Sequence, residues 1–156
     1  MLLLADESQA NEIGAMSPAA LALADAFWPG GLTLVVGQRS GVDLPDALTG
    51  GARTIGLRVP DHPCPRALAA AIGPIPVTSA NRSGEPEAST ASAIAEQLGD
   101  GLDLILDGGA AHGGPASTVV DCAGGDIRLL RSGAIDARAV ERVLAAVGLR
   151  LTPPLT

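Results

Sequence analysis

Two arginines of this chain stand at the ends of apolar stretches, where binding residues are often found. Arg58 lies in the apolar run of residues 54–60, and Arg131 follows Leu129 and Leu130 just before a glycine turn. An arginine among apolar residues is costly to bury unless an anion pairs with it, and its planar guanidinium group matches carboxylate and phosphate oxygens. For Arg58, an edge-strand residue that points to solvent is an equally good interpretation. For Arg131, a surface arginine is the alternative.

Small polar side chains lie beside other predicted strands. Thr78, Ser79 and Asn81 come directly after the apolar residues 75–77, and Ser117 follows a glycine-rich stretch. Hydroxyl and amide groups at the end of a buried strand can donate hydrogen bonds to a carboxylate or phosphate, and glycines let the backbone approach a ligand closely. Taken alone, each segment is better interpreted as a capped turn or an ordinary loop. The prediction of a site therefore depends on their combination.

The composition narrows the classes of function. All ten cations are arginine, the net charge is −7, and the aromatic residues are Phe27 and Trp28 alone. An acidic total argues against broad binding to a nucleic-acid backbone, and two rings are too few for a base-stacking platform. Without lysine there is no phosphate loop of the lysine type, and the usual serine-hydrolase, dinucleotide-binding and zinc-protease motifs are also absent. The two rings are better interpreted as structural, closing a helix onto the sheet.

Cysteine use and apolar run lengths indicate the compartment. Cys64 and Cys122 lack the spacing of a metal site, so we expect two reduced, buried thiols. Residues 1–4 are too short an apolar run for a signal peptide, and no stretch is long enough to cross a membrane. We therefore expect a cytoplasmic protein that does not interact with membranes.

Helices and strands alternate along the chain, which predicts an α/β fold with a mixed sheet and flanking helices in a single domain. We expect helices at residues 19–27, 65–72, 90–98 and 137–147, and strands at residues 32–36, 54–59, 75–78, 104–106, 118–121 and 127–130. Residues 37–51 are polar and predict a surface excursion. The domain is expected to cover residues 1–150, with a tail at 151–156. Residues 2–5 look like the end of a strand with nothing before it, so we expect an N-terminal segment to be missing.

Six motifs occur in an order and spacing that are distinctive as a set. They are Phe-Trp-Pro-Gly-x-Leu-Thr-Leu at 27–34, Gly-Leu-Arg-Val-Pro-Asp-His-Pro at 56–63, Thr-Ser-Ala-Asn-x-Ser-Gly at 78–84, Leu-Asp-Gly-Gly at 106–109, Ser-Thr-Val-Val-Asp at 117–121 and Leu-Arg-x-Gly-Ala-Ile at 130–135. Together they resemble the YrdC/TsaC family of threonylcarbamoyl-AMP synthases, and the resemblance covers residues 16–147.

The resemblance implies a twisted mixed sheet with a concave, cationic surface. It implies an enzyme that joins L-threonine, bicarbonate or CO2, and ATP with Mg2+, and releases pyrophosphate. Partner proteins would transfer the product to the adenosine beside the anticodon of tRNA, and binding of tRNA or double-stranded RNA is left open. Carried over by motif, the expected ATP contacts are Thr54, Ser79, Asn81 and Arg131, and the expected threonine contacts are Arg58, Thr78 and Ser117. This chemistry works by positioning and electrostatics, so no covalent nucleophile and no protein metal site are expected.

The chain also departs from the family pattern. Relatives carry a Lys-x-Arg motif upstream, with nearby Thr and His, that has no counterpart here. Gly31 and Ser132 stand where proline is usual, and Ala116 stands where a polar or acidic residue is usual. A sheet that lacks neighbours would expose backbone groups and favour self-association. The alternatives are a non-catalytic nucleotide- or RNA-binding module and a fragment of a carbamoyl-transferring hydrogenase-maturation protein.

Overall fold

The computed structural model describes residues 1–82, 84–111 and 113–152. The chain forms two compact units, one of Met1–Val77 with Pro115–Thr156 and one of Thr78–Gly114. The strands are β1 (Leu2–Leu3), β2 (Gly14–Ala15), β3 (Leu32–Gln38), β4 (Thr54–Arg58), β5 (Ile75–Pro76), β6 (Thr118–Asp121) and β7 (Arg128–Arg131). The helices are α1 (Glu7–Ile13), α2 (Pro18–Phe27), α3 (Asp46–Thr49), α4 (Pro63–Ile72), α5 (Ala91–Leu98), the 3-10 turn η1 (Gly99–Gly101) and α6 (Ala137–Ala146).

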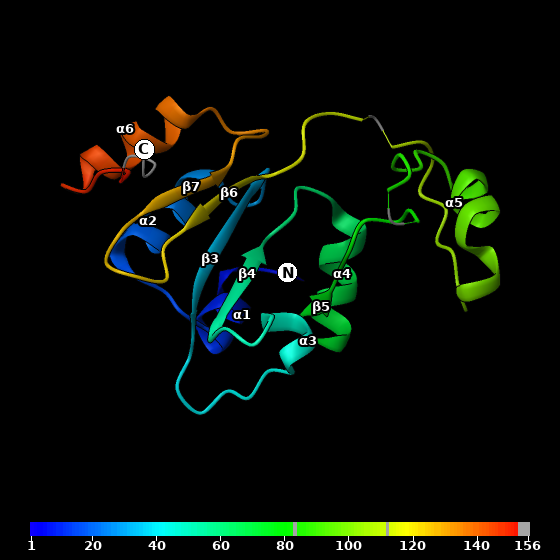
Figure 1. Cartoon of the computed structure of the whole chain (residues 1–156), viewed down its shortest axis with the longest axis horizontal. Coiled ribbons are helices and arrows are strands. Elements are labelled where there is room, and N and C mark those ends of the chain that lie inside the picture. Colours follow the sequence, from blue (N-terminus) through cyan, green and yellow to red (C-terminus); the bar gives the residue numbers. More distant parts are fainter. Residues whose placement is uncertain (83, 112, 153–156) are drawn as a thin grey trace. The chain divides into compact units, whose positions relative to one another are not determined.

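The first unit is built on a 7-stranded mixed sheet in the order β5-β1-β4-β3-β6-β7, with β2 paired to β3 (Figure 1). The β1–β4 and β3–β6 pairs are parallel, and the other pairs are antiparallel. The predicted α/β class with a mixed sheet and flanking helices is therefore confirmed. Strand β1 pairs on both sides, with β4 and β5, so the first residues of the chain lie within the sheet.

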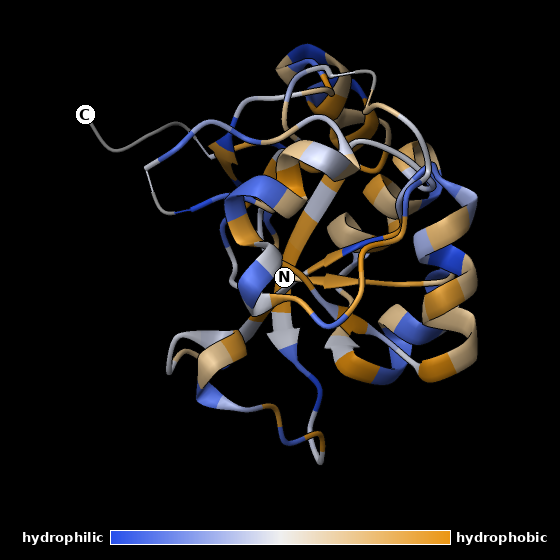
Figure 2. Ribbon diagram, turned by 90° about the vertical axis from the view of Figure 1, so that its right-hand side faces the viewer, coloured by the Kyte–Doolittle hydropathy of each residue, from blue (hydrophilic) through white to orange (hydrophobic). Residues whose placement is uncertain are grey.

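One face of this sheet forms the hydrophobic core. The core residues of β3 and β4 alternate with residues that face the other way, as the two-residue period of a strand requires. They pack against the apolar sides of α1, α2 and α6. The helices drawn in Figure 2 carry both hydrophobic and hydrophilic residues. The fully buried core members with large side chains include Leu4, Leu23, Leu32, Leu34, Val36, Ile55, Leu57, Val120, Val140 and Leu144. The opposite face, called the open face below, carries Thr33, Val35, Gly37, Thr54, Gly56 and Arg58.

Three of the helices begin at residues whose side chains cap them. Ser17 accepts a hydrogen bond from the Ala20 backbone and precedes Pro18, while Thr90 and Asp136 cap α5 and α6. Helix α1 was not predicted, although Asp6 caps it and Gln9 follows three residues later, which is a helix-start signature.

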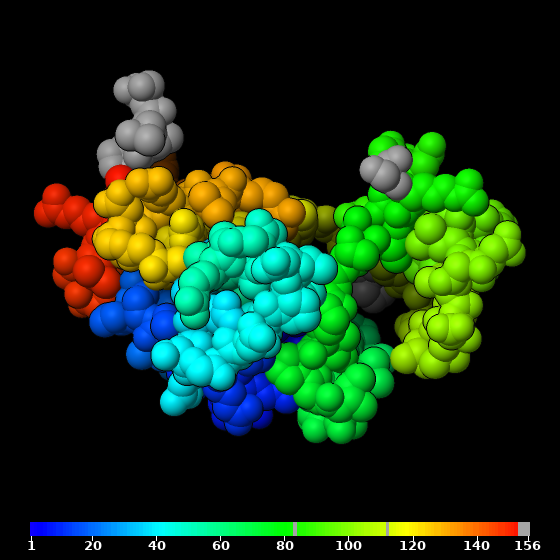
Figure 3. All heavy atoms as spheres, turned by 60° about the horizontal axis from the view of Figure 1, so that its bottom comes forward, coloured from blue at the N-terminus to red at the C-terminus, as the bar shows by residue number. Residues whose placement is uncertain are grey.

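The polar segment after β3 lies at the surface, as predicted, and is drawn in cyan in Figure 3. Its bounds differ from the prediction, because β3 continues to Gln38 and the short helix α3 forms before β4. Trp28 has the predicted structural role: its side chain is 8% exposed, and its indole Nε1 donates to the Leu32 carbonyl at 2.8 Å. Phe27 is half-buried against the same core.

Two predictions are wrong. Residues 104–106 form no strand, because no segment of the described chain pairs with them, and Leu104 is 74% exposed. Cys64 is exposed, since it lies in the first turn of α4, whereas Cys122 is buried in the core as expected. Over the described residues, no helix has the length and apolar character needed to cross a bilayer.

Candidate functional site

The open face of the sheet carries two of the predicted site residues on one strand. Thr54 and Arg58 begin and end β4, and the alternation of the strand places both on the face opposite the core. Thr54 pairs with Gly37, while Arg58 lies at the end where β3 begins. They are four residue steps apart along the strand, about 13 Å at the usual rise per residue. The two residues therefore mark opposite ends of the open face.

Arg58 is half-buried and held in place by the backbone. Its Nε donates to the Gly30 carbonyl at 2.8 Å, and β4 has neighbours on both sides, so the edge-strand interpretation is wrong. Burial lowers the pKa of Arg58, and the positive charge of Arg131 lowers this pKa further. Burial and a second arginine therefore both disfavour the charged form of Arg58.

Arg131 bonds directly to a second predicted residue, Ser117. Its Nε donates to the Ser117 carbonyl at 3.0 Å, and its Nη2 donates to Ser117 Oγ at 2.9 Å. Ser117 Oγ also lies 2.8 Å from Thr33 Oγ1, a buried hydroxyl on β3. A register irregularity between Val119 and Val120 brings Arg131 opposite Val119, and such a bulge re-aims side chains. Arg131 is exposed, as the surface interpretation expects, but its side chain is held in place by these two bonds to Ser117.

Close backbone packing fixes this arrangement. The Ala134 amide donates to the Ala116 carbonyl, and the Thr118 amide donates to the Gly31 carbonyl, both at 2.9 Å. A Cβ atom added at Gly133 would lie 2.1 Å from the Ala116 carbonyl oxygen, so no side chain fits there. The turn after β7 can therefore lie against the segment that carries Ser117.

The cluster has spare hydrogen-bond donors and unbalanced positive charge. In the part of the chain that the structure describes, the one ion pair joins Arg128 to Asp126, so neither Arg58 nor Arg131 has a carboxylate partner. Arg58 uses one of its five N–H groups on the Gly30 carbonyl, which leaves both terminal nitrogens free. Two arginines without carboxylate partners, beside two hydroxyl groups, are suited to binding an anion.

The remaining predicted residues lie in the second unit. Thr78 and Ser79 are exposed at its start. Asn81 is partly buried, and its Nδ2 donates to the carbonyls of Arg82 at 3.0 Å and Glu85 at 2.7 Å. Its Oδ1 is buried without a hydrogen-bond partner among the described residues. The structure therefore brings together Arg58, Ser117 and Arg131, and places Thr54 apart from them on the same strand.

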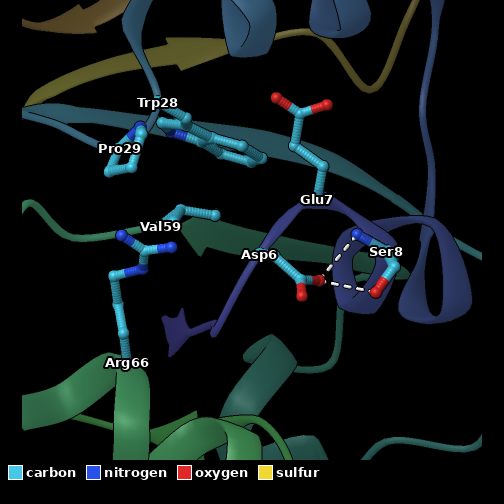
Figure 4. A pocket seen from close by; sticks show the side chains of 7 residues that line it. All are labelled: Asp6, Glu7, Ser8, Trp28, Pro29, Val59 and Arg66. Carbon is cyan, nitrogen blue, oxygen red and sulfur yellow. Dashed lines mark hydrogen bonds between the residues drawn. The ribbon is translucent and has the colours of Figure 1, made fainter. Parts of the chain in front are cut away.

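A separate cavity of about 310 Å3 lies near the ends of β1 and β4 (Figure 4). Its lining residues are Asp6, Glu7, Ser8, Trp28, Pro29, Val59 and Arg66. Arg66 Nε donates to the Ala5 carbonyl at 3.0 Å, and Asp6 accepts from both the Ser8 amide and the Ser8 hydroxyl. Two carboxylates counter the single arginine, so this cavity lacks the excess positive charge of the Arg58–Arg131 cluster.

Comparison with known protein families identifies the family to which this chain belongs. The model named Sua5_yciO_yrdC, described as "Telomere recombination", matches residues 1–133. The chain belongs to this family. Threonylcarbamoyl-AMP synthase of Bacillus subtilis is 38% identical over 150 residues, which cover 92% of this chain and 42% of the relative. That of Pyrococcus abyssi is 36% identical over 126 residues, which cover 80% of this chain and 36% of the relative.

Solved structures of Sua5/YciO/YrdC proteins share the fold. P. abyssi Sua5 complexed with L-threonine has a TM-score of 0.84 at 34% identity, covering 97% of this chain and 44% of that one. Escherichia coli YciO has a TM-score of 0.76 at 27% identity, covering 89% of this chain and 68% of that one. Full-length HypF, at 22% identity and a TM-score of 0.66, shows the same fold and no more. The chain thus spans about half the length, or less, of the synthases it matches.

Thr33 is the residue of this cluster that the sequence did not single out. It belongs to the Phe-Trp-Pro-Gly-x-Leu-Thr-Leu motif, which was interpreted as structural. The sequence did contain an indication of this role, because Thr33 is the one hydroxyl residue among the aliphatic residues 32–36 at the start of β3. Its partner Ser117 lies 84 residues away, so the pattern of β3 alone could not reveal the contact.

Proposed function

We propose that this chain is the catalytic module of a threonylcarbamoyl-AMP synthase. It would form threonylcarbamoyl-AMP and pyrophosphate from L-threonine, bicarbonate or CO2, and ATP. The observation that carries this proposal is the pair Arg58 and Arg131, which have no carboxylate partner among the described residues; Arg131 is also bonded to Ser117. The related Sua5 protein of P. abyssi, which binds L-threonine, supports the choice of amino acid.

Each residue of the cluster has a role that its chemistry fits. Arg58 presents free terminal N–H groups and would bind the threonine carboxylate, with the Ser117 hydroxyl as a second donor. Arg131 keeps its Nη1 free beyond the Ser117 bonds and would bind phosphate oxygens of ATP. Thr54 lies at the far end of the open face and would contact another part of the nucleotide. The separation of Thr54 from Arg58, about 13 Å, suits a nucleotide placed beside a small amino acid.

The second unit carries three further residues with proposed ligand contacts, Thr78, Ser79 and Asn81. Both N–H groups of Asn81 are bonded within its own loop, so the group it can offer a ligand is the Oδ1 acceptor. An acceptor bonds to N–H or O–H groups rather than to phosphate. Asn81 would therefore contact the adenine amino group or a ribose hydroxyl. Thr78 would donate to threonine and Ser79 to the nucleotide.

The reaction needs positioning more than a protein nucleophile. The threonine amine first forms a carbamate, whose oxygen then attacks the α-phosphorus in line. The bond to the β-phosphate oxygen breaks, and pyrophosphate leaves with that electron pair. Arginines neutralise charge on the reacting anions in such transfers. Within residues 1–82, 84–111 and 113–152, no three Asp, Glu, His or Cys side chains gather into a metal site. Mg2+ that enters with ATP would bind phosphate oxygens and water.

The wider assignments follow from the same proposal. The domain would cover residues 1–150, with the tail at 151–156. The protein would act in the cytoplasm, and partner proteins would transfer the threonylcarbamoyl group to tRNA. Binding of tRNA or double-stranded RNA by this chain would have to rely on local arginines, because the net charge is −7.

The test is pyrophosphate release from ATP by the 156-residue chain, with L-threonine and bicarbonate supplied together or singly. We expect release only when both are present, and loss of release in Arg58→Met. Release without L-threonine would assign a different acceptor, and the proposed reaction would then be wrong.

A non-catalytic nucleotide- or RNA-binding module is the second candidate. The observation that favours it concerns the residues given: they contain no lysine, so arginine alone would have to bind the phosphates. Calorimetric titration of the folded chain separates the two candidates. Binding of ATP with no pyrophosphate release under any condition would favour the binding module.

A further inference from the structure

Thr33 is a buried hydroxyl at the centre of the proposed threonine site. Its side chain is 3% exposed, in a strand whose neighbouring core residues are aliphatic. The β3–β4 register pairs Leu34 with Leu57 and Val35 with Gly56, so the next position places Thr33 opposite Arg58. On its other side Thr33 meets Ser117, which is bonded to Arg131. Thr33 thus lies between the two arginines.

A buried hydroxyl is costly unless it is hydrogen-bonded. Thr33 Oγ1 has two partners: Ser117 Oγ at 2.8 Å, and Met1 Sδ at 3.4 Å, which is a weak acceptor. Valine has the same shape and would fill this strand position at lower cost. The hydroxyl is therefore explained by what it does for Ser117 rather than by packing.

The proton positions give Thr33 a definite role. Ser117 Oγ already accepts from Arg131 Nη2, and either hydroxyl can donate in the Thr33–Ser117 bond. If Ser117 donates to Thr33, the Thr33 proton points to Met1 Sδ and Ser117 has no proton left for a ligand. If Thr33 donates to Ser117, both Ser117 lone pairs are occupied by donors and its own proton is free. In the second arrangement Ser117 can donate to an anion.

We propose that Thr33 is a positioning residue that donates to Ser117 and thereby holds the Ser117 hydroxyl as a donor to the carboxylate of L-threonine. This inference rests on the proposed function, because it takes L-threonine as the ligand. It adds a residue to the site and specifies the state of Ser117: one rotamer, with its proton directed to the ligand.

The test compares Thr33→Val with Thr33→Ser by titrating L-threonine and ATP separately. Thr33→Val keeps the shape and removes the donor, so we expect L-threonine to bind about fivefold to tenfold more weakly, as for one lost hydrogen bond. The affinity for ATP should stay within about twofold, because Thr33 acts through Ser117. Thr33→Ser restores the hydroxyl and should bring L-threonine affinity back to within about twofold of the original chain.

The matched control is Thr118→Val, in the strand that follows Ser117. Thr118 is fully buried on the core side, where its hydroxyl donates to the Ile135 carbonyl and accepts from the Ile135 amide. This variant should lose stability without changing the affinity of the folded chain for L-threonine. Equal losses of affinity in Thr33→Val and Thr118→Val would show a general structural effect and overturn the proposal.

A measurement without ligand separates this inference from the proposed function. Side-chain coupling constants of Ser117, measured by NMR, should report one rotamer in the original chain and in Thr33→Ser, and rotamer averaging in Thr33→Val. If the original chain binds no L-threonine, the proposed function fails, while these couplings still decide whether Thr33 positions Ser117. Unchanged couplings in Thr33→Val would overturn the positioning role.

Discussion

Substitution of Arg58 by methionine separates a binding role from a structural one. Methionine keeps an unbranched side chain of similar length and removes the guanidinium group. A hydrogen bond to a charged group contributes about 1.5–3 kcal/mol, and each 1.4 kcal/mol is a factor of ten, so L-threonine should bind about 10- to 150-fold more weakly. This loss should appear in the dissociation constant measured by isothermal titration calorimetry.

The free energy of unfolding should change much less in Arg58→Met than the affinity for L-threonine. Arg58→Met removes the bond to the Gly30 carbonyl, which contributes about 1.5–3 kcal/mol because its donor is charged. It also removes a half-buried cation whose pKa is lowered by burial and by the charge of Arg131. These effects oppose each other, so the free energy of unfolding in urea should change by less than about 1.5 kcal/mol.

The matched control is Arg128→Met, which removes an exposed cation three residues before Arg131. This change should leave L-threonine affinity and stability nearly unchanged, because exposed ion pairs contribute little. The reasoning would be refuted if Arg58→Met bound L-threonine as tightly as the original chain. It would also be refuted if both variants lost affinity to the same extent, since the effect would then be one of net charge.

Three further predictions concern the frame around the site. Gly133→Ala should destabilise the fold by about 3 kcal/mol or more in urea unfolding, since the new Cβ would meet backbone atoms, and should abolish L-threonine binding. Burial raises the pKa of the Cys122 thiol to about 12, so a thiol reagent at pH 8 should label exposed Cys64 quickly and Cys122 only after unfolding; rapid labelling of both would contradict the buried position. The hydrogen bond from Ser8 is the main cause that lowers the pKa of Asp6, so Asp6 stabilises the fold above its unfolded pKa and loses this effect as pH falls through the lower folded value. Between pH 5 and pH 2 the original chain should lose more stability than Asp6→Asn, measured by urea unfolding at each pH.

The sequence was sufficient for features that depend on local chemistry. Caps such as Ser17 and Asp136 specify helix starts through their own side chains, and the apolar runs of β3 and β4 specify strands through their alternation. The predicted strand at 104–106 failed because a strand also needs a partner, and local pattern cannot say whether one is available. For the same reason, the two-residue strand β2 was not predicted, whereas β5 was predicted at residues 75–78 and ends at Pro76.

The residues of the site were predicted only in part. Resemblance to a family indicates which residues could bind a ligand, but not how their side chains are arranged. Arg58, Ser117 and Arg131 were assigned from their motifs, and the structure places them at one end of the sheet face. The bond from Arg131 to Ser117 depends on the irregular β6–β7 register, which no spacing in the sequence reveals. Thr33 was missed because its role depends on a side chain from a distant strand.

The parallel pairing of β3 with β6 makes the site a late product of folding. Strand β4 follows β3 closely and can pair with it early, but the Thr33–Ser117 contact closes a loop of 84 residues. Distant parallel pairs form slowly, because the chain loses loop entropy before any contact compensates for it. The free-energy cost of closing the loop grows by only about 0.6 kcal/mol for each doubling of loop length. Insertions within residues 78–114 should therefore destabilise the β3–β6 pairing very little. A nascent chain therefore acquires its arginine pair only after β7 has been synthesised, and a folding intermediate with β3 and β4 paired would hold Arg58 without Arg131 and Ser117.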